Sequence, residues 1–390
     1  MHRNLKIGYA LAFINELYFP VAIWLLFFLK YLDFTQVAIL GALTTVSSNL
    51  FEIPTGAIAD ILGRKWTLFW SFIISSIGLL VISTGSVFSI FAIGRIINGL
   101  GHSLLSGTHE SLMYDTLKSA GKVSKYEQVV SKKTTLVWIG LFLSSILGGI
   151  IYDFWNVGPF VISAGVYVLA AILCLFIQEP EIDSETFSLA NYVKQNTQGF
   201  YELFKNKRTT QITLLLVTIS AGYFFAAKIL GISQAEQYGM SGKGVGLLFG
   251  VGFIIAAIAS HYYPVMKNKF GNLRLLAIAT LLLLTSFIFA KFVGVILGSL
   301  LIITRIASST SFGNAKSVVV NGFISSKNRA TSLSTLALLS QIPFAVSFYF
   351  VGKYIDNYSP NSFAFLLGIL LIVFLVPQLF LARKILFRKE

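Results

Sequence analysis

The sequence predicts an all-α membrane protein with twelve transmembrane helices. Composition is the first reason: 55% of the 390 residues are hydrophobic, 12% are charged, and the mean hydropathy is +0.78. A soluble protein of this length needs more charge than this to cover its surface. The second reason is a series of twelve apolar stretches, each near the roughly 20 residues with which a helix crosses a ~30 Å hydrocarbon core. The third is the placement of basic residues between those stretches.

Each predicted span is an apolar stretch bounded by polar or turn-forming residues. The first is interpreted as a retained span rather than a signal peptide, because it is too long for a signal core and carries Asn15, Glu16 and Pro20. The ninth and tenth are separated only by Lys291 and its neighbours. In chain order the spans are 8–29, 35–59, 66–84, 87–116, 133–152, 158–178, 209–232, 243–265, 273–290, 293–323, 330–352 and 361–383.

The net charge of +14 is distributed as the positive-inside rule expects. With the N-terminus inside, the predicted inner segments contain 22 of the 30 lysines and arginines, and the outer segments contain four. This asymmetry predicts an even number of spans, with both termini on the cytoplasmic side of the cell's inner membrane. A nucleic-acid partner is not expected, because the basic residues are spread over seven segments that each adjoin a span.

The longest polar segment, 179–208, lies at the centre of the chain. It has acidic residues at its start and basic residues at its end. Its simplest role is a cytoplasmic linker that joins a six-helix bundle formed by 1–178 to a second bundle formed by 209–390. An amphipathic helix at the membrane surface is expected near Leu189–Phe204.

Residues 52–65, EIPTGAIADILGRK, place several charges between two long apolar runs. Ionised groups are costly in hydrocarbon, so this segment is expected to form a tight loop at a membrane surface, with Gly63 as the turn residue. The pattern Gly56-x-x-x-Asp60-x-x-Gly63-Arg64-Lys65 resembles the signature loop between the second and third helices of the major facilitator superfamily. That resemblance implies a secondary transporter with twelve helices in two pseudo-symmetric six-helix halves, working by alternating access.

The same resemblance implies a set of gating contacts at the inner face. The loop arginine, Arg64, is expected to pair with Asp115 at the end of the fourth span. The loop aspartate, Asp60, is expected to cap the eleventh span near 328–331, where free backbone N–H groups attract an anion. The predicted gating residues are Glu52, Gly56, Asp60, Gly63, Arg64 and Asp115.

Charged side chains within the spans are costly, so each is treated as a functional candidate. In the fourth span, polar residues at steps of 3, 4, 4 and 3 form one stripe of a helix, which must face a cavity or another helix. The stripe consists of Arg95, Asn98, His102, Ser106 and His109, with Glu110 beside it. Arg95-x-x-x-Gly99-x-Gly101 resembles the superfamily's fourth-span motif, whose arginine is implicated in proton coupling. The alternative is a structural hydrogen-bonding role for Arg95 and for both histidines.

The tenth span has a similar stripe, and Gly-Arg95-Ile-Ile aligns with Thr-Arg305-Ile-Ala, as two parallel repeats would. The second stripe is Arg305, Ser308, Ser309, Phe312 and Lys316. Because the first, fourth, seventh and tenth spans line the cavity in the superfamily, both stripes are expected to face it. Arg305 and Lys316 favour an anionic or zwitterionic ligand, or a pairing with Glu16. Lys228 is expected to extend toward the membrane interface.

Glu16, roughly 12 Å along the first span at 1.5 Å per residue, is the best candidate for a carboxylate that binds and releases the coupling proton. Alternating exposure to water and to apolar surroundings would change its proton occupancy. The alternative is a static salt bridge to a basic residue of the fourth or tenth span.

The resemblance of the two motifs, at 52–65 and 95–101, to efflux members of the superfamily implies proton-coupled export of a small organic solute. The partners are the solute, protons and the lipid bilayer, and the protein is expected to be a monomer. In the fifth span Ser144-Ser145 replaces the Gly-Pro of the superfamily's antiporter motif, so uptake of an anionic or zwitterionic solute by symport stays open. A non-transporting membrane receptor and a lipid-like cargo also stay open. No phosphate-binding loop and no cysteine–histidine cluster are present in the sequence, so an enzyme, a cofactor and a metal are not expected.

Overall fold

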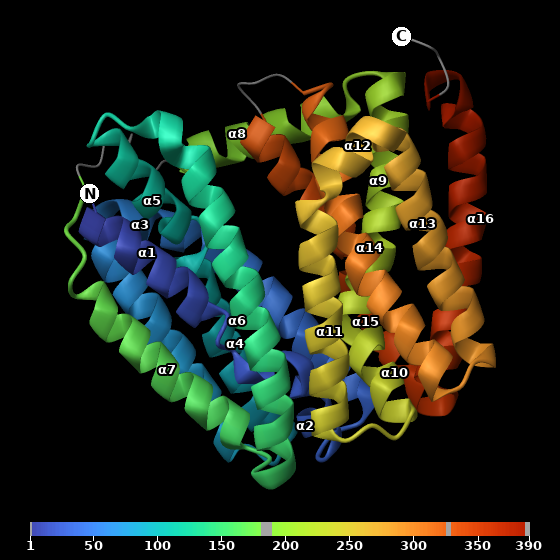
Figure 1. Ribbon diagram of the computed structural model, residues 1–390, viewed down its shortest axis with the longest axis horizontal. Coiled ribbons are helices and arrows are strands. Elements are labelled where there is room, and N and C mark those ends of the chain that lie inside the picture. The colour runs from blue at the N-terminus through green and yellow to red at the C-terminus, as the bar shows by residue number, and fades with distance from the viewer. Residues whose placement is uncertain (1, 181–188, 325–328, 387–390) are drawn as a thin grey trace. The chain divides into compact units, whose positions relative to one another are not determined.

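The computed structural model is helical in every regular element of its described residues (Figure 1). It describes residues 2–180, 189–324 and 329–386; within these, the side chains of 2, 53–54, 56–61, 127, 189–196, 329–330 and 382–386 lie outside the description. The chain divides into two compact units. The first covers Met1–Leu189 and Ser241–Gly250, and the second covers Ala190–Met240 and Val251–Glu390.

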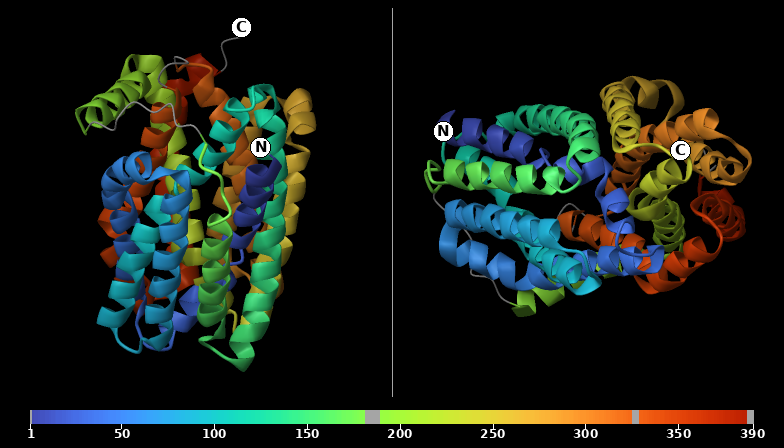
Figure 2. Two further views of the ribbon diagram at one scale, coloured as in Figure 1. Left: turned by 90° about the vertical axis from the view of Figure 1, so that its left-hand side faces the viewer. Right: turned by 90° about the horizontal axis from the view of Figure 1, so that it is seen from below.

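The first unit is built from helices that run side by side (Figure 2, blue to green). The most extensive packing in this unit is between α3 and α4, and α7 also packs against α3. Its elements are α1 (His2–Asn15), η1 (Phe19–Ala22), α2 (Trp24–Leu29), α3 (Phe34–Thr84), α4 (Phe88–Leu105), α5 (Thr108–Lys118), η2 (Val123–Lys125), α6 (Tyr126–Phe154) and α7 (Gly158–Cys174).

In the second unit α13 packs against α14 and α16, and α9 packs against α15 and α16. Its helices, together with α11, which crosses the boundary between the units, are α8 (Leu189–Phe204), α9 (Lys207–Phe225), the π-helix η3 (Ala226–Leu230), α10 (Gly231–Gln237), α11 (Gly242–His261), α12 (Tyr263–Phe270), α13 (Asn272–Ile288), η4 (Phe289–Phe292), α14 (Val295–Asn321), α15 (Arg329–Asn357) and α16 (Pro360–Leu386). A helix is present where one was expected near Leu189–Phe204, as α8, and its position at the membrane surface stays a prediction.

Ten of the twelve predicted spans correspond to helices that are long and apolar enough to cross a membrane. An eleventh, Gly158–Cys174, is an apolar helix of 17 residues. The remaining span is the first of the chain, predicted as one continuous helix over 8–29. It is interrupted, because α1 ends at Asn15 and the chain continues through η1 before α2 begins. The continuous first span was therefore wrong in its local structure.

The interruption has a physical cause in the side chains around it. Pro20 has no backbone N–H and cannot continue a helical hydrogen-bond ladder. The exposed backbone groups find side-chain partners: the Tyr167 hydroxyl donates to the Asn15 carbonyl oxygen at 3.0 Å, and the Phe19 N–H donates to the Ser163 hydroxyl at 3.0 Å. A broken helix is tolerated at membrane depth when neighbouring groups satisfy its backbone in this way.

The predicted loop at 52–65 is a sharp kink inside α3. Gly63 has φ 81° and ψ 169°, a region of backbone conformation that is essentially restricted to glycine, so its expected turn role is confirmed. Gly271, between α12 and α13, has nearly the same angles, φ 78° and ψ 158°. The two glycines occupy the positions expected of repeated signature loops, so the repeat is visible in the backbone conformation as well as in the amino-acid sequence.

Candidate functional site

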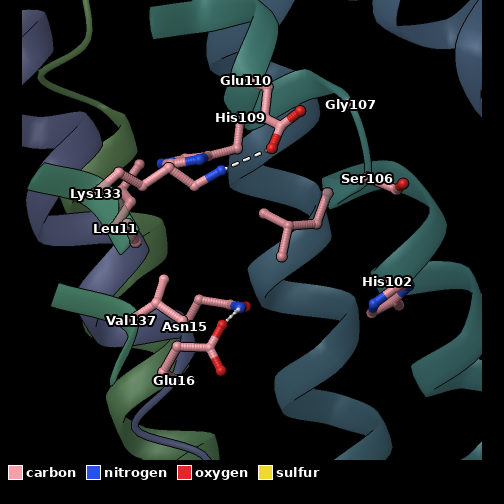
Figure 3. A pocket seen from close by; sticks show the side chains of 12 residues that line it. Leu11, Asn15, Glu16, His102, Ser106, Gly107, His109, Glu110, Lys133 and Val137 are labelled. Atoms are coloured by element: carbon pink, nitrogen blue, oxygen red, sulfur yellow. Dashed lines mark hydrogen bonds and ion pairs between the residues drawn. The ribbon is translucent and has the colours of Figure 1, made fainter. Parts of the chain in front are cut away.

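A cavity of about 270 Å³ lies within the first unit, between α1, α4, α5 and α6 (Figure 3). Its walls combine apolar side chains with most of the residues predicted for the substrate and proton pathway in the first half. The lining residues are Leu11, Ala12, Asn15, Glu16, His102, Leu105, Ser106, Gly107, His109, Glu110, Lys133 and Val137.

Glu16 enters this cavity at the point where α1 ends. Its Oε1 accepts a hydrogen bond from Asn15 Nδ2 at 2.9 Å, and the Ser144 hydroxyl donates to its backbone carbonyl oxygen (Figure 3). Gly140 allows α6 to approach, because a Cβ at that position would lie 2.7 Å from Glu16 Cβ. Within the described part of the first unit, no basic side chain forms an ion pair with the Glu16 carboxylate, so the salt bridge considered for the fourth span is not present.

Another part of the cavity lining contains an ion pair and a buried histidine. Lys133 Nζ donates to Glu110 Oε1 at 2.8 Å (Figure 3). His109 Nε2 lies 2.8 Å from the Gly8 carbonyl oxygen. A carbonyl oxygen only accepts, so Nε2 carries the proton and this contact joins α5 to α1. Glu110 was expected beside the stripe, but its partner Lys133 was not predicted from the sequence.

The predicted single stripe on the fourth span is divided by a break in the helix. α4 ends at Leu105, Gly107 adopts φ 76°, and α5 begins at Thr108. The expectation of one continuous helical face was wrong, because Gly107 takes a backbone conformation that ends a helix. His102 remains on α4, with Nδ1 3.3 Å from the Ser48 hydroxyl of α3, while His109 follows the break.

Arg95 is not among the residues that line this cavity. Its guanidinium carbon lies 5.0 Å from the ring centroid of Trp24 and 4.9 Å from that of Phe28, both on α2. The guanidinium also interacts with the Tyr18 side chain. This environment agrees with the structural alternative considered for Arg95, since two ring faces and a phenol can hold a cation in place.

The predicted contact between Arg64 and Asp115 is present, with Nε 3.3 Å from Oδ2 and both side chains largely buried. A third residue, Glu179, was not assigned a role from the sequence. Its carboxylate accepts hydrogen bonds from the backbone N–H groups of Arg64 and Lys65, where the helix resumes after Gly63. Negative charge at a helix N-terminus is favourable. An acidic residue directly after the sixth span was the available signal.

The structure describes less of the other predicted gating residues. Glu52 is exposed. The surroundings of Gly56, the Asp60 side chain, residues 325–328 and the side chains of residues 329–330, near the predicted cap of the eleventh span, lie outside the described part of the structure. The Asp60 cap therefore stays a prediction.

In the second unit, Arg305 is 3% exposed and its Nη2 donates to Gln234 Oε1 at 2.8 Å. Lys316, three turns further along α14, places Nζ 3.2 Å from the Ser220 hydroxyl. The Tyr223 hydroxyl on α9 donates to the Ser308 hydroxyl at 3.0 Å. Gln234 carried no motif, and only the three-dimensional contact identifies it.

Comparison with known proteins gives the family. The model of the Major Facilitator Superfamily matches residues 5–326. The Bacillus subtilis protein described as the uncharacterized MFS-type transporter YxaM is 29% identical over 60% of this chain and 59% of its own length, so the chain spans less than two thirds of that relative. The quinolone resistance protein NorA of Staphylococcus aureus is 22% identical over 60% of this chain and 59% of its own length.

Among solved structures, the nucleoside transporter NupG superimposes with a TM-score of 0.80 over all of both chains at 14% identity, which shows a shared fold. The all-α fold predicted from the sequence is thereby confirmed over the whole chain. The chain belongs to the major facilitator superfamily, whose members are secondary transporters, and is a multi-pass membrane protein.

Proposed function

We propose that this transporter exports a small organic solute across the cytoplasmic membrane in exchange for protons, by alternating access. The observation that carries the proposal is the placement of Glu16: a carboxylate at a helix break, facing a cavity, with no ion pair in the described part of the first unit. Ionisable residues at membrane depth that face a cavity are typical of proton and ion pathways.

The break at Glu16 suits proton exchange for a chemical reason. A carboxylate locked to an arginine would remain ionised throughout a transport cycle. Glu16 has an amide partner, Asn15 Nδ2, which donates to the ionised form and does not hold it as a cation would. Its charge can therefore respond to the cavity's contents, either a proton or the solute.

The remaining polar groups of the cavity support a path between Glu16 and the inner end of the unit. His109 and the Glu110–Lys133 pair line the same cavity and lie at the start of α5 and in α6. The Arg64–Asp115 contact lies at the other end of α5. In the proposed topology, with both termini cytoplasmic, this end is the inner face, so the pair would act as a gating contact with Glu179.

Export is proposed on the similarity to relatives such as NorA, which is named for quinolone resistance. Ser144 and Ser145, where the antiporter motif has Gly-Pro, weaken the resemblance to efflux members at two positions. The observation that favours the symport alternative is the pair of cations on α14, Arg305 and Lys316, which suits an anionic solute.

The test uses membrane vesicles of both orientations, an imposed pH gradient and a fluorescent quinolone as the probe, because a relative is named for resistance to that class. Proton-coupled export predicts accumulation in inverted vesicles whose interior is acidic. Accumulation in right-side-out vesicles with an acidic exterior would establish symport and overturn the proposal. Binding of the quinolone with no gradient-dependent movement in either orientation would favour a receptor.

A further inference from the structure

The two units contain arginines that correspond in the repeat but differ in their surroundings. Arg95 on α4 and Arg305 on α14 are 210 positions apart, and the letters around them align. Trp24 and Gln234, one packed on each arginine, are also 210 positions apart. The same offset of 210 positions therefore relates the two arginines and their neighbours. The neighbour is the indole of Trp24 in the first unit and the amide of Gln234 in the second.

In the first unit the arginine is enclosed by ring faces. Trp24 and Phe28 lie 5.0 Å and 4.9 Å from the guanidinium carbon of Arg95. Ring faces stabilise a cation, and the Tyr18 side chain adds one polar contact, while Arg95 Nε has no acceptor among the described residues. This arrangement is a packing site for a permanent cation.

In the second unit Tyr238 occupies the position that corresponds to Phe28, 210 residues earlier. Here the arginine is hydrogen-bonded to a polar side chain. Gln234 accepts from Arg305 Nη2 at 2.8 Å and is held by Asn361, whose Oδ1 accepts from Gln234 Nε2 at 2.9 Å. The Tyr238 hydroxyl is 3.5 Å from the same Asn361 oxygen. One ring remains, Phe287, at 5.3 Å from the guanidinium carbon.

The guanidinium of Arg305 is incompletely satisfied by the chain itself. The residue is 3% exposed, and Nη1 has no hydrogen-bond acceptor among the described residues. No carboxylate of the described second unit forms an ion pair with it. A buried charge whose donors lack partners is unfavourable unless an anion completes them. The adjacent Nη1 and Nη2 form the fork that matches the two oxygens of a carboxylate.

The backbone beside this group is also irregular. The π-helix Ala226–Leu230 directly precedes α10, which carries Gln234. Such single-turn π segments occur frequently at functional sites, because the wider turn displaces the residues that follow it. Gly298, two turns before Arg305 on α14, leaves space for Tyr238, since a Cβ there would lie 2.2 Å from the Tyr238 hydroxyl oxygen.

We propose that Arg305 and Gln234 form a binding site for a carboxylate group of the transported solute. The carboxylate binds across Nη1 and Nη2 and takes the place of the Gln234 oxygen at Nη2. Arg95, enclosed by rings, serves as the structural counterpart. This inference rests on the proposed transport function, because it names the chemical class of the solute.

The test measures thermal unfolding of the purified full-length protein in detergent, with benzoate as the probe, benzamide as its neutral analogue and inorganic phosphate as a second anion. Benzoate is expected to raise the Tm of the wild type by about 2–4 °C near saturation, with no response to benzamide. Arg305→Lys keeps the charge but loses the fork, so its response to benzoate should be lost. Arg274→Lys, at an exposed arginine of the same unit, is the matched control and should respond as the wild type does.

Gln234→Glu gives a second, nearly isosteric variant that does not remove the arginine. Its new carboxylate should pair with Arg305, raise the Tm without ligand and abolish the benzoate response. Arg95→Lys should keep the benzoate response even if its Tm falls. A benzoate response that persists in Gln234→Glu, or a response to phosphate alone, would overturn the carboxylate site.

The two proposals fail separately. Gradient-driven movement of the quinolone by a wild type that ignores benzoate would overturn the carboxylate site and leave proton-coupled export standing. A wild type that responds to benzoate but moves no solute in either vesicle orientation would overturn the transport proposal instead.

Discussion

At the scale of single residues, Gly63 and Gly271 share one backbone conformation but have different surroundings. Both lie in a region that costs other residues about 1–3 kcal/mol. A Cβ on Gly63 would also lie 2.7 Å from the Glu179 carboxylate, whereas nothing lies within 4 Å of one on Gly271. Gly63→Ala should therefore lower the Tm in detergent further than Gly271→Ala does. Equal losses would show that the Glu179 contact contributes nothing to stability.

Whether a residue's role could be predicted depended on how its partner is identified, from a motif or only from the folded structure. The turn role of Gly63 and the Arg64–Asp115 contact followed from a local motif with its resemblance. Glu179 and Gln234 were missed because each acts through a partner more than 70 positions away. A sequence records which residues are present but not which distant backbone N–H or guanidinium they will meet.

At the scale of elements, α6 is closely packed against both the broken first span and the start of α11. A Cβ on Gly149 would lie 2.2 Å from the Gly242 carbonyl oxygen, and one on Gly246 would lie 2.4 Å from that of Ser145. Asp153 at the end of α6 accepts hydrogen bonds from the N–H groups of Gly242 and Lys243 at 2.8 and 2.9 Å. This first part of α11 thus belongs to the first unit.

Substitution of Gly149 tests the importance of that packing. Gly149→Ala should force the helices apart and destabilise the protein by about 1–3 kcal/mol, as overpacking does. Gly165→Ala on α7 is the control, because nothing lies within 4 Å of its Cβ and alanine favours a helix by roughly 1 kcal/mol over glycine. Thermal unfolding of both variants in detergent provides the comparison. A Gly149→Ala variant as stable as Gly165→Ala would contradict the close approach.

The sequence located the spans better than it located their interruptions. Hydropathy measures the transfer of side chains into hydrocarbon, so it is insensitive to where a backbone ladder breaks. The first span contained Pro20 and the fourth contained Gly107, and the structure breaks near both. These breaks form the cavity, since Glu16, Ser106 and Gly107 all line it. The site could therefore be predicted as a set of residues, but not as a shape.

At the scale of the whole molecule, the proposed transport cycle requires a membrane protein that binds a proton on one side of the bilayer and releases it on the other. Composition, span count and the asymmetry of basic residues predicted the fold class, because a bilayer constrains composition and span length more strictly than water does. The substrate, the direction and the coupling ion depend on a few side chains in a cavity and leave no comparable pattern along the chain.

The most direct test compares the wild type with Glu16→Gln in proteoliposomes, with the fluorescent quinolone as the probe. The variant keeps a polar side chain of the same length but cannot bind and release a proton. Accumulation driven by a pH gradient should fall to background, while exchange of quinolone across the membrane without a gradient should persist. Asp356→Asn, at an exposed carboxylate of α15, should match the wild type in both measurements. Undiminished gradient-driven accumulation by Glu16→Gln would contradict proton coupling at Glu16.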